Sequence, residues 1–325
     1  MKILILHPGA LGDVILSLPT LQVLRERFQH ARITLAANID FAGAVATGYA
    51  DQIISLSALP LHRLHGSESI PLEDVMLWRS YDRIISWTGS GAEGFTKQFA
   101  QLHPCVLVAS WRPAAGEEAH VASLFMDSLR PWFSPPREIV PPGIRLEATA
   151  RVQGEEWLRE QGWQGRKPVL ALHPGAGSAA KRWPLQRFQG LAQWLGTLGD
   201  PLVVEGPAET GIGRELAGAC NPGTYLASSL PLPLLAGVLS HCRLYVGNDS
   251  GIAHLAAGLQ TACVVLFGPT SSGNWAPIGK QVVVVRNTRG CIACEEEPGA
   301  AHTCMGNIPL ETVQERVFRV LQSRV

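Results

Sequence analysis

The same five residues occur twice in this chain, each time directly after an apolar run. Leu6-His-Pro-Gly-Ala10 follows the run that begins at Lys2, and Leu172-His-Pro-Gly-Ala176 follows the run that begins at Pro168. Short unbroken apolar runs are typical of strands that are buried on both faces of a parallel sheet. A match of five residues is short, and coincidence stays open as an explanation. The repeat nevertheless favours two similar α/β domains.

Length and composition fit that organisation. The chain has 325 residues, of which 46% are hydrophobic and 17% charged, so it exceeds the usual size of one domain and can bury a large core. Its 27 Lys and Arg balance its 27 Asp and Glu, which argues against a nucleic-acid-binding protein with a strong positive field. The segment 1–19 lacks the basic leader and long apolar run of a signal peptide, and no later run has the length of a membrane span. We expect a cytoplasmic protein.

Strands and helices alternate through both halves. In the first half a glycine-bearing loop and a helical pattern follow the opening strand, and further strands are predicted at 33–37, 52–56, 83–87 and 105–108. In the second half strands are predicted near 201–205, 223–227, 243–246, 262–267 and 281–285. This alternation indicates doubly wound α/β domains.

A proline-rich segment at 134–143 suits a linker. We place an N-terminal domain at 1–150 and a second domain at 151–308, with a cleft between them at the carboxyl ends of their strands. The residues from 309 to 325 contain an amphipathic helix, which we expect to pack back on the first domain.

Residues 243–258 combine the features of an anion site. A strand ends at Val246, the polar turn 247–251 follows, and a helix of small residues opens behind it. Asn, Asp and Ser cap helix starts, and the first amides of a helix attract anions. Asp249 and His254 are spaced so that both can face a ligand at the helix mouth. A well-capped helix with a satisfied histidine is the alternative interpretation.

The loop 173–184, after the second pentapeptide, consists mostly of small residues and carries Lys181. Open backbone amides and a mobile positive charge favour a cradle for a diphosphate. The loop matches neither a P-loop nor the Gly-x-Gly-x2-Gly of dinucleotide-binding folds, and a solvated loop with a surface lysine is the alternative. After the next strand, Glu205 or Glu209 could accept hydrogen bonds from ribose hydroxyls, or Glu209 could be a plain helix-start carboxylate.

Two loops of the first domain follow its strands in the same way. Asp13 stands where the first loop enters its helix, so the simplest account is an N-cap that accepts amide hydrogen bonds. If the cleft lies between the domains, the same carboxylate could take a proton from a hydroxyl group as a general base. The loop 88–94 is rich in glycine and could line an acceptor pocket, or be an ordinary connection.

The chain has seven cysteines, and four of them lie in or beside apolar segments, as buried reduced thiols do: Cys105, Cys220, Cys242 and Cys263. The other three form a Cys-x2-Cys-x9-Cys pattern that, with a histidine, could supply four metal ligands: Cys291, Cys294, His302 and Cys304. Only one Cys-x2-Cys pair is present and the spacing matches no standard zinc module. Clustered thiols or a disulfide are the alternatives.

Taken together, these motifs resemble glycosyltransferase family 9, the ADP-heptose:lipopolysaccharide heptosyltransferases. The matching segments come in the family's order and span nearly the whole chain: Gly12-Asp13, His173-Pro174-Gly175, Lys181-x-Trp183-Pro184, Gly206-Pro207-Ala208-Glu209, the segment 247–256 and Cys304-Met305. The resemblance implies a GT-B fold of two Rossmann-like domains, with the acceptor on the first and the nucleotide sugar on the second. It also implies an inverting, metal-independent transfer that needs no cofactor.

The resemblance assigns roles to individual residues as well. Asp13 would be the general base, with Gly12, Ser90 and Gly91 on the acceptor side. The remaining site residues would bind the donor: Ser178 and Lys181 in the phosphate loop, Glu209 at the ribose, and Asp249, Ser250, Gly251 and His254 at the helix mouth. Some members of the family carry threonines where this chain has Ala176 and Gly177, which leaves Ser178 and backbone amides for the phosphates.

The expected partners are ADP-heptose, a lipid-linked saccharide acceptor (lipid A-Kdo or heptose) and the cytoplasmic face of the inner membrane, which the protein would contact peripherally. Three alternatives stay open: a glycosyltransferase for another nucleotide sugar, a sugar-nucleotide epimerase with the same architecture, and a non-catalytic module that binds a nucleotide sugar.

Overall fold

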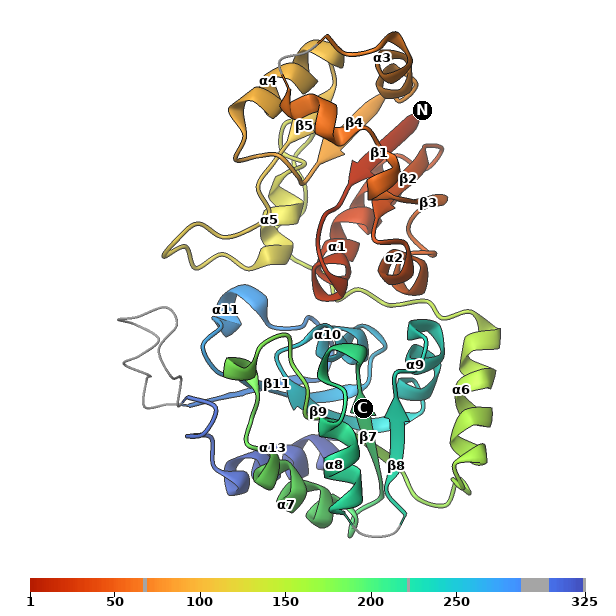
Figure 1. The fold of residues 1–325 in the computed structure, drawn as a ribbon, viewed down its shortest axis with the longest axis vertical. Coiled ribbons are helices and arrows are strands. Elements are labelled where there is room, and N and C mark those ends of the chain that lie inside the picture. Colours follow the sequence, from red (N-terminus) through yellow and green to blue (C-terminus); the bar gives the residue numbers. More distant parts are fainter. Residues whose placement is uncertain (67–68, 221–222, 288–303, 324–325) are drawn as a thin grey trace. The chain divides into compact units, whose positions relative to one another are not determined.

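The computed structural model describes residues 1–66, 69–220, 223–287 and 304–323. The chain divides into two compact units, Met1–Arg145 and Leu146–Val325 (Figure 1). Within the described ranges, the helices lack the combination of length and hydropathy that a membrane crossing needs.

Unit 1 is built on a parallel sheet with the strand order β3-β2-β1-β4-β5. Its strands are β1 (Lys2–Leu6), β2 (Arg32–Ala37), β3 (Gln52–Ser55), β4 (Arg83–Ser86) and β5 (Val106–Val108). Its helices are α1 (Leu11–Arg27), α2 (Ile39–Val45), α3 (Leu72–Arg79), α4 (Glu93–Leu102) and α5 (Val121–Asp127), with the 3-10 turns η1 (Leu56–Ala58) and η2 (Leu61–His65). The apolar run of β1 is buried because this strand is central: Ile5 lies opposite Leu35 on one side and Ile85 on the other.

Unit 2 repeats this plan with the strand order β11-β10-β9-β6-β7-β8, again parallel throughout. Its strands are β6 (Val169–His173), β7 (Asp200–Glu205), β8 (Tyr225–Ser228), β9 (Cys242–Asn248), β10 (Ala262–Phe267) and β11 (Val282–Arg286). Its helices are α6 (Ala148–Glu160), α7 (Leu185–Leu195), α8 (Ile212–Gly218), α9 (Leu232–Leu239), α10 (Gly251–Gly258), α11 (Ser272–Trp275) and α13 (Leu310–Gln322), with the 3-10 turns η3 (Ala179–Lys181) and η4 (Pro207–Glu209). The prediction of two doubly wound α/β domains is confirmed.

The last helix, α13, is buried in a different place from the one we expected. Val313, Val317 and Val320 recur at helical spacing and form its buried face. That face belongs to the core of unit 2, where α13 packs on β9, β10, β11 and α7. The expectation that this helix packs back on the first domain is therefore wrong. Periodicity shows that one face is buried, but it does not identify the partner surface.

Candidate functional site

Each sheet has one point at which the chain reverses direction across it. In unit 1, β2 and β3 lie on one side of the first strand, β1, and β4 and β5 lie on the other. In unit 2, β7 and β8 lie on one side of the first strand, β6, and β9, β10 and β11 lie on the other. In such sheets ligands bind at the carboxyl ends of the two strands that flank this switch point. The loops that follow β1 and β4 meet this condition in unit 1, and those that follow β6 and β9 meet it in unit 2. All predicted catalytic and donor-binding loops leave these strands or their neighbour β7.

Asp13 lies in the first turn of α1, two residues after the helix begins, and its side chain is half-buried. Ala10 occupies the N-cap position that we assigned to Asp13 from the sequence. The Asp13 Oδ2 atom instead reaches back and accepts the N–H of Ala10 at 2.8 Å. A carboxylate at this position is stabilised by the helix dipole and satisfies an amide that the helix leaves open.

His7 is the first residue of the loop between β1 and α1, and it is fully buried. Its Nδ1 atom accepts the N–H of Gly9 at 3.0 Å, and its Nε2 atom lies 3.3 Å from the backbone carbonyl oxygen of Asp13. The imidazole ring stacks on Phe125 and meets Trp87 edge-on, both at a centroid distance of 5.4 Å. Burial among these rings lowers the pKa of His7 to about 4, so the imidazole is neutral near pH 7.

The loop after β4 carries the other residues predicted for the acceptor side. Ser90 and Gly91 are exposed, and Gly12 in the first loop is half-buried. Gly89 has a φ of +79°, and a side chain there would overlap Phe95, so the turn requires glycine. The structure thus places both loops at the switch point of unit 1.

In unit 2 a lysine and an aspartate from opposite sides of the switch point form an ion pair. Lys181 in η3 follows β6, Asp249 follows β9, and the Lys181 Nζ atom lies 2.8 Å from Asp249 Oδ2. The Asp249 side chain is 7% exposed and that of Lys181 is 32% exposed. The charge of Lys181 is therefore held beside the first turn of α10, where helix amides also attract anions.

His173, the counterpart of His7, connects three side chains. Its Nε2 atom lies 2.7 Å from Glu209 Oε1, and its Nδ1 atom lies 3.2 Å from the hydroxyl oxygen of Ser250 and 3.3 Å from that of Tyr245. Both His173 and Glu209 are buried. Burial raises the pKa of Tyr245, whose phenol therefore keeps its proton. This network joins the ends of β6 and β9 to η4.

The two glutamates that the sequence left as alternatives for the ribose have different surroundings. Glu205 is buried at the end of β7, where it accepts the N–H groups of Gly211 and Arg214 and the hydroxyl of Ser228. Burial acts to raise its pKa, but these three donors outweigh it and leave the pKa below the ordinary value. Its hydrogen bonds hold α8 and β8 in place. Glu209 lies nearer the switch point, against His173.

The remaining predicted donor residues lie on the same rim. Ser178 is exposed and occupies the N-cap position before η3, and Gly251 is half-buried at the start of α10. Ser250 caps α10, since its hydroxyl accepts the N–H of Ala253 at 3.4 Å. His254 is buried one turn further along the same helix.

Sequence reasoning missed the residues that hold the rim together. Asn248 donates to the carbonyl oxygens of Pro174 and Gly175 at 2.8 and 3.2 Å and accepts the N–H of Trp183, so it fixes the loop 173–184 to β9. Neither Asn248 nor the histidine of either pentapeptide was predicted as a site residue. The repeat itself was the available signal, because it set the same histidine after the central strand of each sheet.

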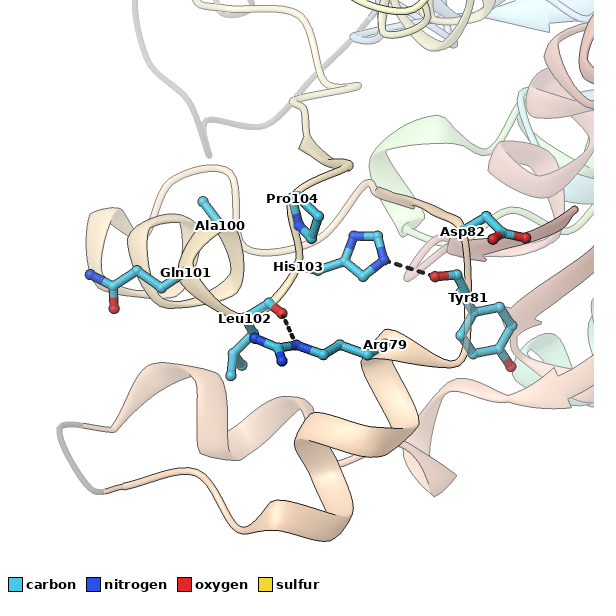
Figure 2. A pocket seen from close by; sticks show the side chains of 8 residues that line it. All are labelled: Arg79, Tyr81, Asp82, Ala100, Gln101, Leu102, His103 and Pro104. Carbon is cyan, nitrogen blue, oxygen red and sulfur yellow. Dashed lines mark hydrogen bonds between the residues drawn. The ribbon is translucent and has the colours of Figure 1, made fainter.

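A cavity of about 590 Å³ lies at the opposite edge of the sheet of unit 1, beside the amino ends of β4 and β5. It is lined by Arg79, Tyr81, Asp82, Ala100, Gln101, Leu102, His103 and Pro104 (Figure 2). Arg79 and His103 in its wall bond to the carbonyl oxygens of Leu102 and Tyr81 at 3.2 and 2.9 Å. Because ligands of this fold bind at the carboxyl edge, we assign this cavity no part in the site.

The four residues considered as metal ligands cannot be assembled from the described structure. Cys304 is buried, while Cys291, Cys294 and His302 lie outside the described residues. Among the residues that are described, no group of three or more His, Cys, Asp or Glu side chains could hold a metal ion.

Two doubly wound parallel-sheet domains in one chain are the architecture of the GT-B fold, which the structurally similar glycosyltransferases share. Residues 107–304 match the model of glycosyltransferase family 9 (heptosyltransferase), which is more than half of the chain. The chain belongs to this family.

Individual relatives agree with this assignment. Lipopolysaccharide heptosyltransferase 2 of Salmonella typhimurium is 25% identical over 324 residues, covering 89% of each chain, whereas another curated heptosyltransferase aligns over 48% of its length. A family 9 glycosyltransferase from Veillonella parvula has the same fold, with a TM-score of 0.83, 19% identity and coverage of 99% of this chain and 98% of that one. An E. coli heptosyltransferase solved with ADP superposes with a TM-score of 0.67 at 18% identity, over 98% of this chain and 100% of its own.

Proposed function

We propose that this chain transfers heptose from ADP-heptose to a lipopolysaccharide-core acceptor, with inversion at the anomeric carbon and without a metal ion. The observation that carries the proposal is that each unit has charged residues at its own switch point: the carboxylate of Asp13 in unit 1, and a lysine-aspartate pair and a buried glutamate in unit 2. Membership of family 9 supports it, as does the E. coli heptosyltransferase solved with ADP.

In the proposed reaction Asp13 acts as the general base. Its carboxylate takes the proton from an acceptor hydroxyl while that oxygen forms a bond to the anomeric carbon of heptose. The bond between this carbon and the diphosphate oxygen breaks, and ADP leaves with the electron pair. Attack from the face opposite to ADP inverts the anomeric carbon.

The donor-binding residues of unit 2 would stabilise the charge that develops on the departing diphosphate. Lys181 and the amides of Ser250 and Gly251 supply fixed positive charge and donors, which do this work well in a site that excludes water. We propose that this charge makes a metal ion unnecessary. Ser178 adds a hydroxyl to the phosphate loop, and Asp249 and His254 complete the donor contacts.

Glu209, rather than Glu205, would hold the ribose. Both carboxylate oxygens of Glu205 accept hydrogen bonds from within unit 2, whereas the bond from His173 to Glu209 engages Oε1. Gly12, Ser90 and Gly91 would line the acceptor side. Since that acceptor is lipid-linked, we further propose that the protein works as a peripheral protein at the cytoplasmic face of the inner membrane.

The test separates chemistry from donor binding. We expect Asp13→Asn to lower kcat by at least about 100-fold, the usual contribution of a positioned base, while ADP affinity changes by less than about twofold. Asp40→Asn is the matched control, because Asp40 is an exposed carboxylate in the first turn of α2 on the same edge of the sheet. Release of ADP and formation of glycoside and of epimer are measured together.

Lys181→Met should instead change the affinity for ADP, the quantity that Asp13→Asn leaves nearly unchanged. It should weaken ADP binding by about 10- to 100-fold, since a charge-assisted contact to phosphate is lost, and Lys167→Met at the other edge of the sheet should leave binding unchanged. Near wild-type turnover in Asp13→Asn would remove the base assignment, and epimer without glycoside would make the chain an epimerase. Unchanged ADP affinity in Lys181→Met would remove the phosphate cradle.

A further inference from the structure

We propose that His7 is a positioning residue that fixes the loop carrying Asp13, and so holds the Asp13 carboxylate in its working orientation. This inference rests on the proposed role of Asp13 as the base. It assigns a function to a histidine that the reaction itself does not use.

The hydrogen bonds of His7 determine which of its nitrogens carries the proton. The N–H of Gly9 can only donate, so the Nδ1 atom that it meets at 3.0 Å must accept. The carbonyl oxygen of Asp13 can only accept, so the Nε2 atom 3.3 Å away must donate. A neutral imidazole protonated at Nε2 satisfies both contacts, and burial keeps the ring neutral.

The ring that makes these two contacts is itself held on several sides. It stacks on Phe125 and approaches Trp111 at a centroid distance of 6.2 Å, while the edge-on contact with Trp87 limits its rotation. Trp87 is in turn fixed by a 3.0 Å hydrogen bond from its indole N–H to the hydroxyl of Ser128. His7 therefore presents its two nitrogens to the loop from a rigid wall.

Both ends of the loop are thereby tied to one ring. Gly9 is bound at Nδ1 and the backbone of Asp13 at Nε2, and between them the N–H of Ala10 donates to Asp13 Oδ2 at 2.8 Å. Gly9 lies so close that a Cβ atom on it would overlap the Asp13 side chain. Loss of the His7 contacts would let this turn relax, and a displacement of about 1 Å at a reacting group can lower a rate by about 100-fold.

A second histidine in unit 1 offers a matched control. His103 is also buried, its Nδ1 atom accepts the N–H of Cys105 at 3.1 Å, and its Nε2 atom donates to the carbonyl oxygen of Tyr81 at 2.9 Å (Figure 2). This is the same pattern of hydrogen bonds at the other edge of the sheet, away from Asp13. A histidine with a purely structural role should behave like His103.

The experiment compares His7→Phe, His7→Gln and His103→Phe in the full-length chain. His7→Phe keeps an aromatic ring in the wall and removes both hydrogen bonds, so we expect kcat to fall about 10- to 100-fold with the donor KM changed by less than about twofold. The acidic limb of the pH profile of kcat/KM should move to higher pH, because the relaxed turn would no longer hold the N–H of Ala10 against the Asp13 carboxylate, and that donor favours the charged form. His7→Gln, which can still donate to Asp13, should recover part of kcat, and His103→Phe should lower stability but not kcat.

A measurement on the wild-type chain does not depend on the variants folding. Nitrogen-15 NMR of His7 should report the Nε2-protonated neutral tautomer near pH 7, and the protonated ring or the other tautomer would overturn the inference. So would wild-type kcat and pH profile in a folded His7→Phe chain. If Asp13→Asn also keeps its turnover, the proposed role of Asp13 as the base fails, and the inference fails with it. If Asp13→Asn is inactive while His7→Phe is normal, only the present inference fails.

Discussion

The two copies of Leu-His-Pro-Gly-Ala have the same sequence and follow the same kind of strand, but their histidines have different hydrogen-bond partners. In unit 1 the hydrogen bonds described for the histidine join it to backbone groups, those of Gly9 and Asp13, and its ring lies among aromatic side chains. In unit 2 the same histidine contacts side chains, the carboxylate of Glu209 and the hydroxyls around it. Each copy of the pentapeptide thus supports a carboxylate. In unit 1 the backbone N–H of Ala10 donates to Asp13, and in unit 2 the side chain of His173 bonds to Glu209.

The glycine of each copy leaves room for that carboxylate. A Cβ atom on Gly9 would overlap Asp13, and one on Gly175 would overlap the Glu209 carboxylate. The repeat is therefore more than a strand followed by a turn. In each copy the histidine forms a hydrogen bond to an acidic residue, and the glycine leaves space for its carboxylate. That residue is Asp13 from the same loop in unit 1, and Glu209 from the loop after the neighbouring strand in unit 2.

The largest expected effect on either copy of the pentapeptide is that of Gly175→Ala on ADP affinity. The added methyl group must displace the Glu209 carboxylate and its bond to His173, so we expect ADP affinity to fall by about 100-fold, as for a lost charged hydrogen bond. Gly177→Ala is the control, since a Cβ atom there meets nothing within 4 Å. Calorimetric titration with ADP measures both variants.

Gly9→Ala should separate the two copies when turnover is measured beside the ADP titration. It should lower kcat and leave ADP affinity unchanged, because the side chains that the added methyl group would overlap, those of Asp13 and His7, belong to unit 1. If both glycine variants lost donor affinity equally, the two turns would not serve separate halves of the reaction.

A smaller effect concerns the free energy of unfolding and its dependence on pH. Burial lowers the pKa of His7 from 6.5 to about 4, so below pH 6.5 the unfolded chain binds a proton that the folded chain does not. The stability from this residue is complete above the unfolded pKa and is lost as the pH falls toward the folded one, by about 3 kcal/mol in all.

Urea unfolding of the wild-type chain and of His7→Phe, at about pH 7 and about pH 4.5, checks this prediction. Groups other than His7 titrate equally in both chains, so the wild type should lose more stability than the variant. An equal loss in the two chains would contradict the assignment of a neutral, buried His7.

The smallest effect sharpens the comparison in unit 2. Ser250→Ala removes both the cap of α10 and a hydroxyl that contacts His173, and we expect a loss of about 1 kcal/mol or more in thermal unfolding. Ser271→Ala is the control, because Ser271 caps α11 with the same 3.4 Å contact, to the N–H of Asn274. The stability difference between the two variants reports the hydrogen bond to His173, and its absence would mean that Ser250 acts as a cap alone.

Much of the candidate site could be predicted because its loops follow apolar strands. Asp13, Lys181 and Asp249 stand after the first and fourth strands of their units, and the order of strands in a doubly wound sheet brings such loops to one edge. The choice between Glu205 and Glu209 could not be made in this way. Both follow the same strand, and only the packing of α8 and β8 shows which one is used up by internal hydrogen bonds.

By itself, the sequence determined the two parallel sheets, the repeated turn after each central strand and the burial of one face of the last helix. These features follow from local hydrophobic periodicity and from the backbone preferences of glycine and proline. Only the tertiary structure decided that the last helix packs in unit 2, that Asp13 lies past the cap, and what each pentapeptide histidine touches. The partners of a side chain are decided by which elements meet around it, and that depends on residues far away in the chain.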